Sequence, residues 1–309
     1  MKHPFTATLA AGGVVLFDGA LATELERRGA DLSSHLWSAR LISDDPEAII
    51  AVHLDHLRAG ADVISSASYQ ASRLGFAKLG LSESAADALL TKAVELANEA
   101  VRRHGDDSRL VGASLGPYGA VLADGSEFTG DYARSVDELI EFHLPRVDAA
   151  LRASPDLVLF ETLPSMAECE AVARIAARFP QVPFMASFSA KAGAISHGEP
   201  FANVVARLDE VPNVIAVGIN CSAPDVAAPL LRSAAPKRVL LAASPNSGET
   251  WDATSRQWNG TPYRGERFGA LARSYVEAGA RIVGGCCRTR PADIAAARLT
   301  LGGRSPHQT

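Results

Sequence analysis

The sequence predicts one α/β domain, a (β/α)8 TIM-type barrel, from three observations. Eight short runs rich in β-branched residues alternate with segments of helical periodicity. The runs are almost continuously apolar, which is typical of parallel strands covered on both faces. A length of 309 residues with 47% hydrophobic residues suits one such barrel with a large core. No linker or shift in composition divides the chain, so we predict a barrel domain over residues 1–301 and a disordered tail over 302–309.

Each strand and helix is predicted from its own local pattern. The predicted strands are 14–18, 62–68, 110–115, 157–161, 184–188, 215–221, 239–243 and 282–285. A helix begins at Pro46 and stops before Gly60, and another begins after Ser82, a typical N-cap residue. Helical periodicity then predicts helices over 132–151, 165–178, 202–208, 224–233, 264–278 and 291–299.

Charge and composition exclude several classes of partner. A net charge of −5 argues against a nucleic-acid partner. The sequence contains no run of about 18 apolar residues, so no membrane span is predicted. Four cysteines are too few for a disulfide framework in a chain of this length, and free thiols suit a reducing compartment. We therefore expect a cytoplasmic protein that acts on small molecules.

Three of the four cysteines stand at predicted strand ends. Cys221 closes the strand 215–221, and Cys286 and Cys287 follow the run that ends at Gly285. If neighbouring strands bring these ends together, three thiolates converge on a tetrahedral Zn²⁺ site with its fourth position open. The alternatives are buried apolar cysteines, or a disulfide between Cys286 and Cys287, whose adjacency fits disulfide geometry poorly. Cys169 lies in a helical pattern and is predicted to be a packing residue.

Polar residues at the other strand ends supply candidate substrate contacts, because barrel chemistry lies at the C-terminal ends of the strands. Asp18 and Glu161 can together hold an ammonium group, and a salt bridge to arginine is the alternative. Gly19 and Ala20 offer N–H groups for a carboxylate. The remaining candidates are Tyr118, Thr162, Ser187, Asn220 and Asn246. Long connections over 120–131, 190–200 and 248–265 suit a lid or donor-binding role.

Two further motifs favour structural interpretations. His53 and His56 can share one helix face, but this helix is expected outside the barrel, so we predict a solvated or partly buried face. Residues 112–116 match the G-x-S-x-G nucleophile motif around Ser114. That motif requires a helix directly after it, and we expect none where Pro117 follows.

Taken in order along the chain, the strand-end motifs resemble those of the homocysteine S-methyltransferases, in particular the S-methylmethionine-dependent branch. The matching stretches are 17–25, 67–72, 116–119, 122–127, 160–162, 218–221, 245–249 and 284–289. The resemblance implies that Cys221, Cys286 and Cys287 are catalytic zinc ligands. It also implies that Asp18 and Glu161 contact homocysteine.

The implied reaction transfers a methyl group from S-methylmethionine or S-adenosylmethionine to the zinc-bound thiolate of L-homocysteine, giving methionine. Aromatic faces suit a sulfonium donor, and the candidates are Trp37, Tyr69, Tyr118 and Trp251. Betaine is an alternative donor. A barrel lyase or hydrolase using zinc-bound water is an alternative enzyme, and a zinc-storage or redox-sensing protein is the non-enzymatic alternative.

Overall fold

A computed structural model describes residues 5–32, 37–252 and 257–302, and it confirms the barrel. Eight parallel strands form one sheet in the order β1-β12-β9-β8-β5-β4-β3-β2. A parallel bridge between Phe17 and Val63 joins the two edge strands, so the sheet closes on itself. The strands are β1 (Val15–Leu16), β2 (Val63–Ser65), β3 (Leu110–Leu115), β4 (Leu157–Leu163), β5 (Phe184–Phe188), β8 (Val214–Asn220), β9 (Leu240–Ser244) and β12 (Ala280–Val283).

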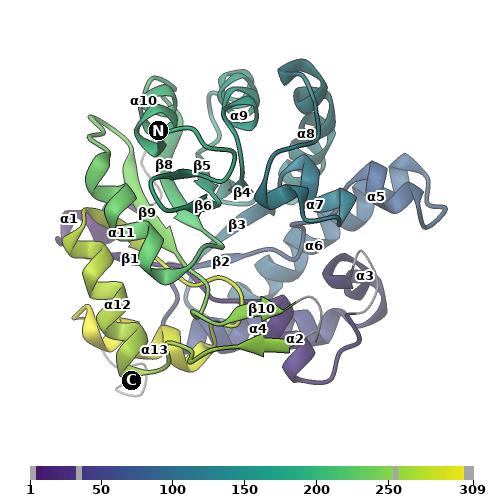
Figure 1. Cartoon of the computed structure of the whole chain (residues 1–309). Coiled ribbons are helices and arrows are strands. Elements are labelled where there is room, and N and C mark those ends of the chain that lie inside the picture. Colours follow the sequence, from purple (N-terminus) through teal and green to yellow (C-terminus); the bar gives the residue numbers. More distant parts are fainter. Residues whose placement is uncertain (1–4, 33–36, 253–256, 303–309) are drawn as a thin grey trace.

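Helices surround this sheet, as Figure 1 shows. Those that follow a barrel strand are α4 (Pro46–Arg58), α6 (Glu83–His104), α8 (Val136–Leu151), α9 (Met166–Arg178), α10 (Phe201–Asp209), α11 (Pro224–Ser233), α12 (Glu266–Glu277) and α13 (Pro291–Thr300). The Ser82 side chain caps α6, as predicted. The helix predicted from residue 132 begins later, because Ser135 and Glu138 form a capping box at the start of α8.

Alternate residues of the strands face two separate cores. One core lies inside the barrel and includes Val15, Leu159 and Ile282, with Phe5 packed edge-on to Phe17 beside it. The other lies between the sheet and the helices and includes Leu16, Phe160 and Val283. Because both faces of each strand are buried, the strands read as continuous apolar runs in the sequence.

Short elements that the sequence did not predict lie mostly in the connections. They are α1 (Thr6–Ala10), α3 (Trp37–Asp44), α5 (Arg73–Ala77), α7 (Tyr118–Leu122), the 3-10 helix η1 (Ser126–Phe128) and the hairpins β6–β7 (Ala190–Lys191, Ala194–Ile195) and β10–β11 (Thr250–Asp252, Gln257–Asn259). The helix α2 (Ala22–Arg27), by contrast, was expected after the first strand, at Gly19 and Ala20. Each of the three long connections therefore holds local structure. None of the helices in the described ranges has the length and apolar character needed to span a membrane. Apart from residue 302, the predicted tail lies outside the described residues.

Candidate active site

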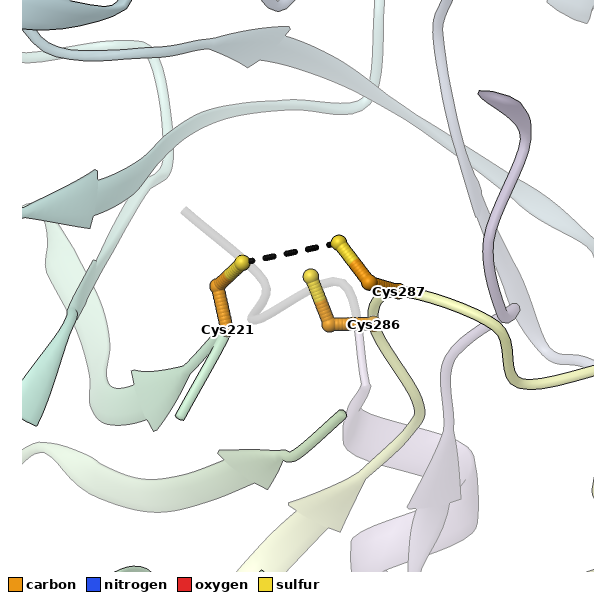
Figure 2. Close-up of side chains that lie close together, drawn as sticks. All are labelled: Cys221, Cys286 and Cys287. Atoms are coloured by element: carbon orange, nitrogen blue, oxygen red, sulfur yellow. Dashed lines mark hydrogen bonds between the residues drawn. The ribbon is translucent and has the colours of Figure 1, made fainter. Parts of the chain in front are cut away.

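Three cysteines from two barrel strands meet at one point. Cys221 follows β8 directly, and Cys286 and Cys287 follow β12 after two glycines. Their sulfur atoms all lie within 4.8 Å of one another, and the Cys221 and Cys287 sulfurs are 3.7 Å apart. Figure 2 shows the three side chains pointing toward a common centre. No other group of possible metal ligands forms among the residues that the structure describes.

Hydrogen bonds with the residues that follow β9 fix the cysteine pair. The Cys286 N–H donates to the Pro245 carbonyl at 2.7 Å, and the Cys287 N–H donates to the Asn246 side-chain oxygen at 3.1 Å. The Ser247 N–H donates in return to the Cys287 carbonyl at 3.0 Å. Asn246, predicted as a substrate contact, thus lies where it orients a cysteine.

Close packing explains the glycine that precedes the pair. A β-carbon at Gly285 would meet the Thr289 side chain, with the nearest carbon atoms at 2.6 Å. The Thr289 hydroxyl donates to the Cys286 carbonyl, and the Gly285 N–H donates to the Asp18 carbonyl at 3.0 Å. The loop carrying both thiols is therefore fastened to the end of β1, with no room for a side chain at this position.

Two residues at the site adopt left-handed backbone conformations that non-glycine residues seldom use. Cys221 has a φ of 49° and Thr162 a φ of 63°. The register of β4 against β5 also shifts between Phe160 and Leu163. Such conformations persist only where the surroundings impose them, and they cluster at functional sites.

The pKa values of the three thiols favour a bound cation at this site. Hydrogen bonds with Cys286 and Cys287 raise the pKa of Cys221 well above its usual range. Hydrogen bonds with Cys221 and Cys286 lower the pKa of Cys287 well below that range. The trio thus accommodates one thiolate readily, and full deprotonation requires a neighbouring positive charge.

The sulfur geometry also fits a metal. Tetrahedral Zn²⁺ with Zn–S bonds of about 2.3 Å places its sulfur ligands roughly 3.8 Å apart. The separation of 3.7 Å between Cys221 and Cys287 matches this spacing. The three residues therefore fit a Zn²⁺ ion with one position left for a further ligand.

A cavity of about 240 Å³ opens beside the cysteines at the C-terminal ends of the strands. Its lining includes all three cysteines and the predicted residues Asp18, Gly19, Ala20, Glu161, Thr162 and Asn220. We call it the main cavity. The fold thus brings together, around one space, residues that are far apart in the sequence.

Asp18 and Glu161 face the main cavity without a basic partner. The Asp18 carboxylate accepts from the Ser65 N–H at 2.8 Å and the Ser65 hydroxyl at 3.0 Å, and Glu161 accepts from the Ser114 hydroxyl. Burial raises the pKa of Asp18 to about 8, aided by repulsion from Glu161, and burial likewise raises the pKa of Glu161. Within the described ranges neither acid forms an ion pair, so the arginine salt bridge considered above is absent and a cationic ligand would be their counter-ion.

The N–H groups of Gly19 and Ala20 are not free, contrary to expectation. Gly19 donates to the His56 ring at 3.3 Å, and Ala20 donates to the Thr289 carbonyl at 3.1 Å. His53 and His56 are fully buried rather than solvated, because α4 packs against α6 and β2. Burial lowers the pKa of His56 to about 4, so its neutral ring can accept this hydrogen bond.

Two other predicted contacts lie outside the described lining of the main cavity. Ser187 is buried within β5. The Tyr118 ring packs against Tyr132 and Phe142, with centroid distances of 5.4 Å and 5.1 Å. Its N–H donates to Glu168 because a helix, α7, does begin here, contrary to the prediction after Pro117. The side chains of Trp37 and Trp251 lie outside the described residues.

Among the aromatic residues predicted to contact the donor, Tyr69 does line the main cavity. Arg146, fully buried in α8, donates to the Tyr69 carbonyl at 2.8 Å, to Ala71 at 2.8 Å and to Gly116 at 2.7 Å. A β-carbon on Gly116 would lie 2.7 Å from the Tyr69 ring, so the ring packs directly on the backbone just after β3. The sequence signals for Tyr69 were its strand-end position, its aromatic ring and its place in the matching stretch 67–72.

Other cavity residues escaped the sequence-based prediction. Ser65 and Ser114 orient the two acids, and Glu127 and Phe128 reach the main cavity from η1. Ser114 is the central residue of the G-x-S-x-G match, but it lies inside β3 and bonds Glu161 rather than a histidine. Cys169 is fully buried in α9, as predicted.

Comparison with known proteins gives consistent matches over nearly the whole chain. A family model described as homocysteine S-methyltransferase matches residues 15–301. The homocysteine S-methyltransferase of Escherichia coli K12 is 45% identical, over 96% of this chain and 97% of its own. Homocysteine S-methyltransferase YbgG of Bacillus subtilis is 42% identical, over 94% and 96%. The crystal structure of the homocysteine methyltransferase MmuM from Escherichia coli in its metallated form superposes with a TM-score of 0.86 at 41% identity, over 96% and 99%.

Proposed function

Because the chain belongs to the homocysteine S-methyltransferase family, we propose that it methylates L-homocysteine from a sulfonium donor, with Zn²⁺ held by Cys221, Cys286 and Cys287. S-Methylmethionine is the proposed donor. The observation that carries this proposal is the meeting of three thiols at a cavity that also contains Asp18 and Glu161, which form no ion pair with any described residue. Family membership makes the chain a methyltransferase, so a lyase or hydrolase no longer competes.

The metal would make a bound substrate thiol more acidic and would fix its orientation. Bound by three thiolates, Zn²⁺ would deprotonate a further thiol at neutral pH and would hold it in place. A free alkyl thiol, with a pKa near 8.5, is mostly protonated and unreactive under the same conditions.

The chain's own residues position the acceptor. Asp18 and Glu161 would bind the homocysteine ammonium group, each fixed by a serine hydroxyl. Binding of a cation would lower the pKa of both acids and so favour their charged forms. The fastened loops after β8 and β12 keep the cysteine sulfurs together while the substrate enters. Positioning and charge would supply most of the rate acceleration.

The methyl transfer requires no oxidant or reductant. The thiolate sulfur gives an electron pair to the methyl carbon, and the bond from that carbon to the donor sulfur breaks. The donor sulfur keeps the released pair and becomes a neutral thioether. With S-methylmethionine and homocysteine, two molecules of methionine result, and the thiol proton passes to solvent.

The experiment that tests this function is methionine formation by purified, zinc-loaded protein. Homocysteine would be offered with S-methylmethionine, S-adenosylmethionine or betaine in parallel. We expect turnover with S-methylmethionine that stops on chelation and returns with zinc. Turnover with betaine alone would overturn the donor assignment, and full turnover of the metal-free protein would overturn the role of zinc.

The same proposal bears on the location of the protein in the cell and on its domain organisation. Small-molecule substrates and free thiols suit the cytoplasm, our proposed location. The family match over residues 15–301 supports one methyltransferase domain over residues 1–301.

A further inference from the structure

A second cavity of about 390 Å³ adjoins the main cavity. Its lining includes Phe128, Asp131, Lys191, His197 and Cys221. Phe128 and Cys221 also line the main cavity, so the two spaces meet at this pair of residues. The size is in the range of small-molecule sites. A ligand here would contact Cys221 and Phe128, whereas Asp18 and Glu161 belong to the lining of the main cavity.

Two of the long connections build this cavity and are tied to each other. The Ser196 hydroxyl donates to the Ser189 hydroxyl at 2.9 Å, and the Ser189 hydroxyl donates to the Glu127 carbonyl at 3.3 Å. These bonds join the hairpin β6–β7 to η1. The Ala190 N–H donates to the Ser222 hydroxyl at 2.8 Å, which anchors the hairpin beside Cys221. The second cavity is therefore a formed part of the active face.

Opposite charges stand at its rim. Asp131 and Lys191 are both exposed, and neither forms an ion pair with any other residue in the described part of the chain. His197, by contrast, contacts Glu199, with 2.9 Å from its Nδ1 to the carboxylate oxygen. A carboxylate and an ammonium group that line one cavity without ion-pair partners among the described residues match the two charged groups of an α-amino acid.

We propose that the second cavity binds the methyl donor and that Asp131 and Lys191 hold its amino-acid end. Asp131 would bind the α-ammonium group and Lys191 the α-carboxylate. This inference rests on the proposed function and adds to it the place of the donor and the two residues that bind its charged groups. The sulfonium methyl then points to the shared wall at Phe128 and Cys221.

The arrangement of the two cavities suits an in-line transfer of the methyl group. The acceptor thiolate approaches from the main cavity, and the donor sulfur leaves on the side of the second cavity. The methyl carbon crosses between the two spaces, so neither amino acid has to turn during the reaction. In betaine the only cationic group is the trimethylammonium that carries the methyl, so it cannot bind Asp131 while its methyl lies at Cys221, and the charge pair therefore favours an amino-acid sulfonium donor over betaine.

The test uses zinc-loaded protein with Asp131→Asn and Lys191→Met. At saturating homocysteine, each variant should raise the KM for S-methylmethionine about tenfold, with kcat and the KM for homocysteine unchanged. The Kd for S-methylmethionine alone, measured by calorimetry, should rise by the same factor. Trimethylsulfonium, which has no amino-acid end, should react equally well with the variants and with the unchanged protein.

Matched controls lie at the opposite end of the barrel. Asp107→Asn and Lys237→Met alter exposed residues that precede β3 and β9, and their KM values should match those of the unchanged protein. Unaltered donor KM and Kd in both cavity variants would overturn the donor site while leaving the methyl transfer standing. No methionine from S-methylmethionine in the unchanged protein would instead overturn the proposed function.

Discussion

The side-chain amide of Asn220 bonds Thr162 twice across the barrel. Its oxygen accepts from the Thr162 N–H at 2.9 Å, and its nitrogen donates to the Thr162 hydroxyl at 3.0 Å. Both residues are buried, and Asn220 directly precedes Cys221. One amide therefore holds the left-handed turn at the end of β4 and the end of the strand that carries the first thiol.

Asn220→Ala should lower the free energy of unfolding by about 2–3 kcal/mol, because it leaves the buried Thr162 N–H without a partner. Urea unfolding of the metal-free protein measures the loss. Asn203→Ala, at an exposed position in α10, is the matched control and should change stability by less than about 0.5 kcal/mol. Equal stability of the two variants would show that the double hydrogen bond contributes little.

The cysteines separate into a metal-binding trio and a packing residue. Cys221→Ser, Cys286→Ser and Cys287→Ser should each reduce zinc content well below one ion per chain and abolish methionine formation, since hydroxyl oxygen is a poor ligand for Zn²⁺ beside two thiolates. Cys169→Ala removes the fully buried thiol of α9 and should retain both zinc and turnover. Elemental analysis with an activity assay on the same samples checks this. Full zinc content in any variant of the trio would contradict the assignment.

Asp18 should make the free protein less stable as the pH rises. Its pKa is raised from 3.8 to about 8 in the folded chain, so between these values the folded state holds a proton that the unfolded state has lost. Stability then falls with rising pH across this window. Asp18→Asn removes the effect and should gain about 1–3 kcal/mol over the unchanged protein between pH 5 and pH 8, while losing turnover.

Unfolding of metal-free Asp18→Asn at a series of pH values provides the measurement. Asp107→Asn alters an exposed carboxylate and controls for the change in net charge. A stability difference that stays constant with pH would show that Asp18 is already charged in the folded protein.

Gly285→Ala should loosen the cysteine loop without removing a ligand. The new β-carbon would collide with Thr289, and either the Thr289 bond to the Cys286 carbonyl or the Gly285 bond to Asp18 would have to break. We expect zinc affinity to fall by at least about tenfold, with three thiols still present. Competition with a zinc chelator measures the affinity. The double variant with Thr289→Gly should recover part of it, and an unchanged affinity in Gly285→Ala would contradict the close packing.

Local pattern was sufficient to predict the barrel but only part of its site. Strands buried on both faces are apolar throughout, so β3 and β5 were predicted to the residue. The three cysteines could be grouped because parallel strands end on one face. Asn246 and Gly19 were predicted to bind substrate, yet their hydrogen bonds go to Cys287 and His56. Both bonds join segments distant in the sequence, and no local pattern records such pairing.

The residues that escaped prediction are those whose role depends on a neighbour. Ser65 and Ser114 look like ordinary strand residues until the barrel closes and sets them against Asp18 and Glu161. Tyr118 stood at a strand end with an aromatic ring, but α7 turns that ring onto Tyr132 and Phe142. A short helix of five residues has too weak a signal to be seen in the sequence.

Closure of the barrel also sets the order in which the protein can mature during synthesis. β1 pairs with β12, and the Arg288 N–H donates to the Thr23 hydroxyl across 265 residues of chain. A ribosome must therefore deliver the last strand before the barrel can close, and the same strand brings Cys286 and Cys287 to Cys221. A nascent chain holding only Cys221 has one of the three ligands. Metal uptake would thus follow barrel closure and would mark the chains that have completed it.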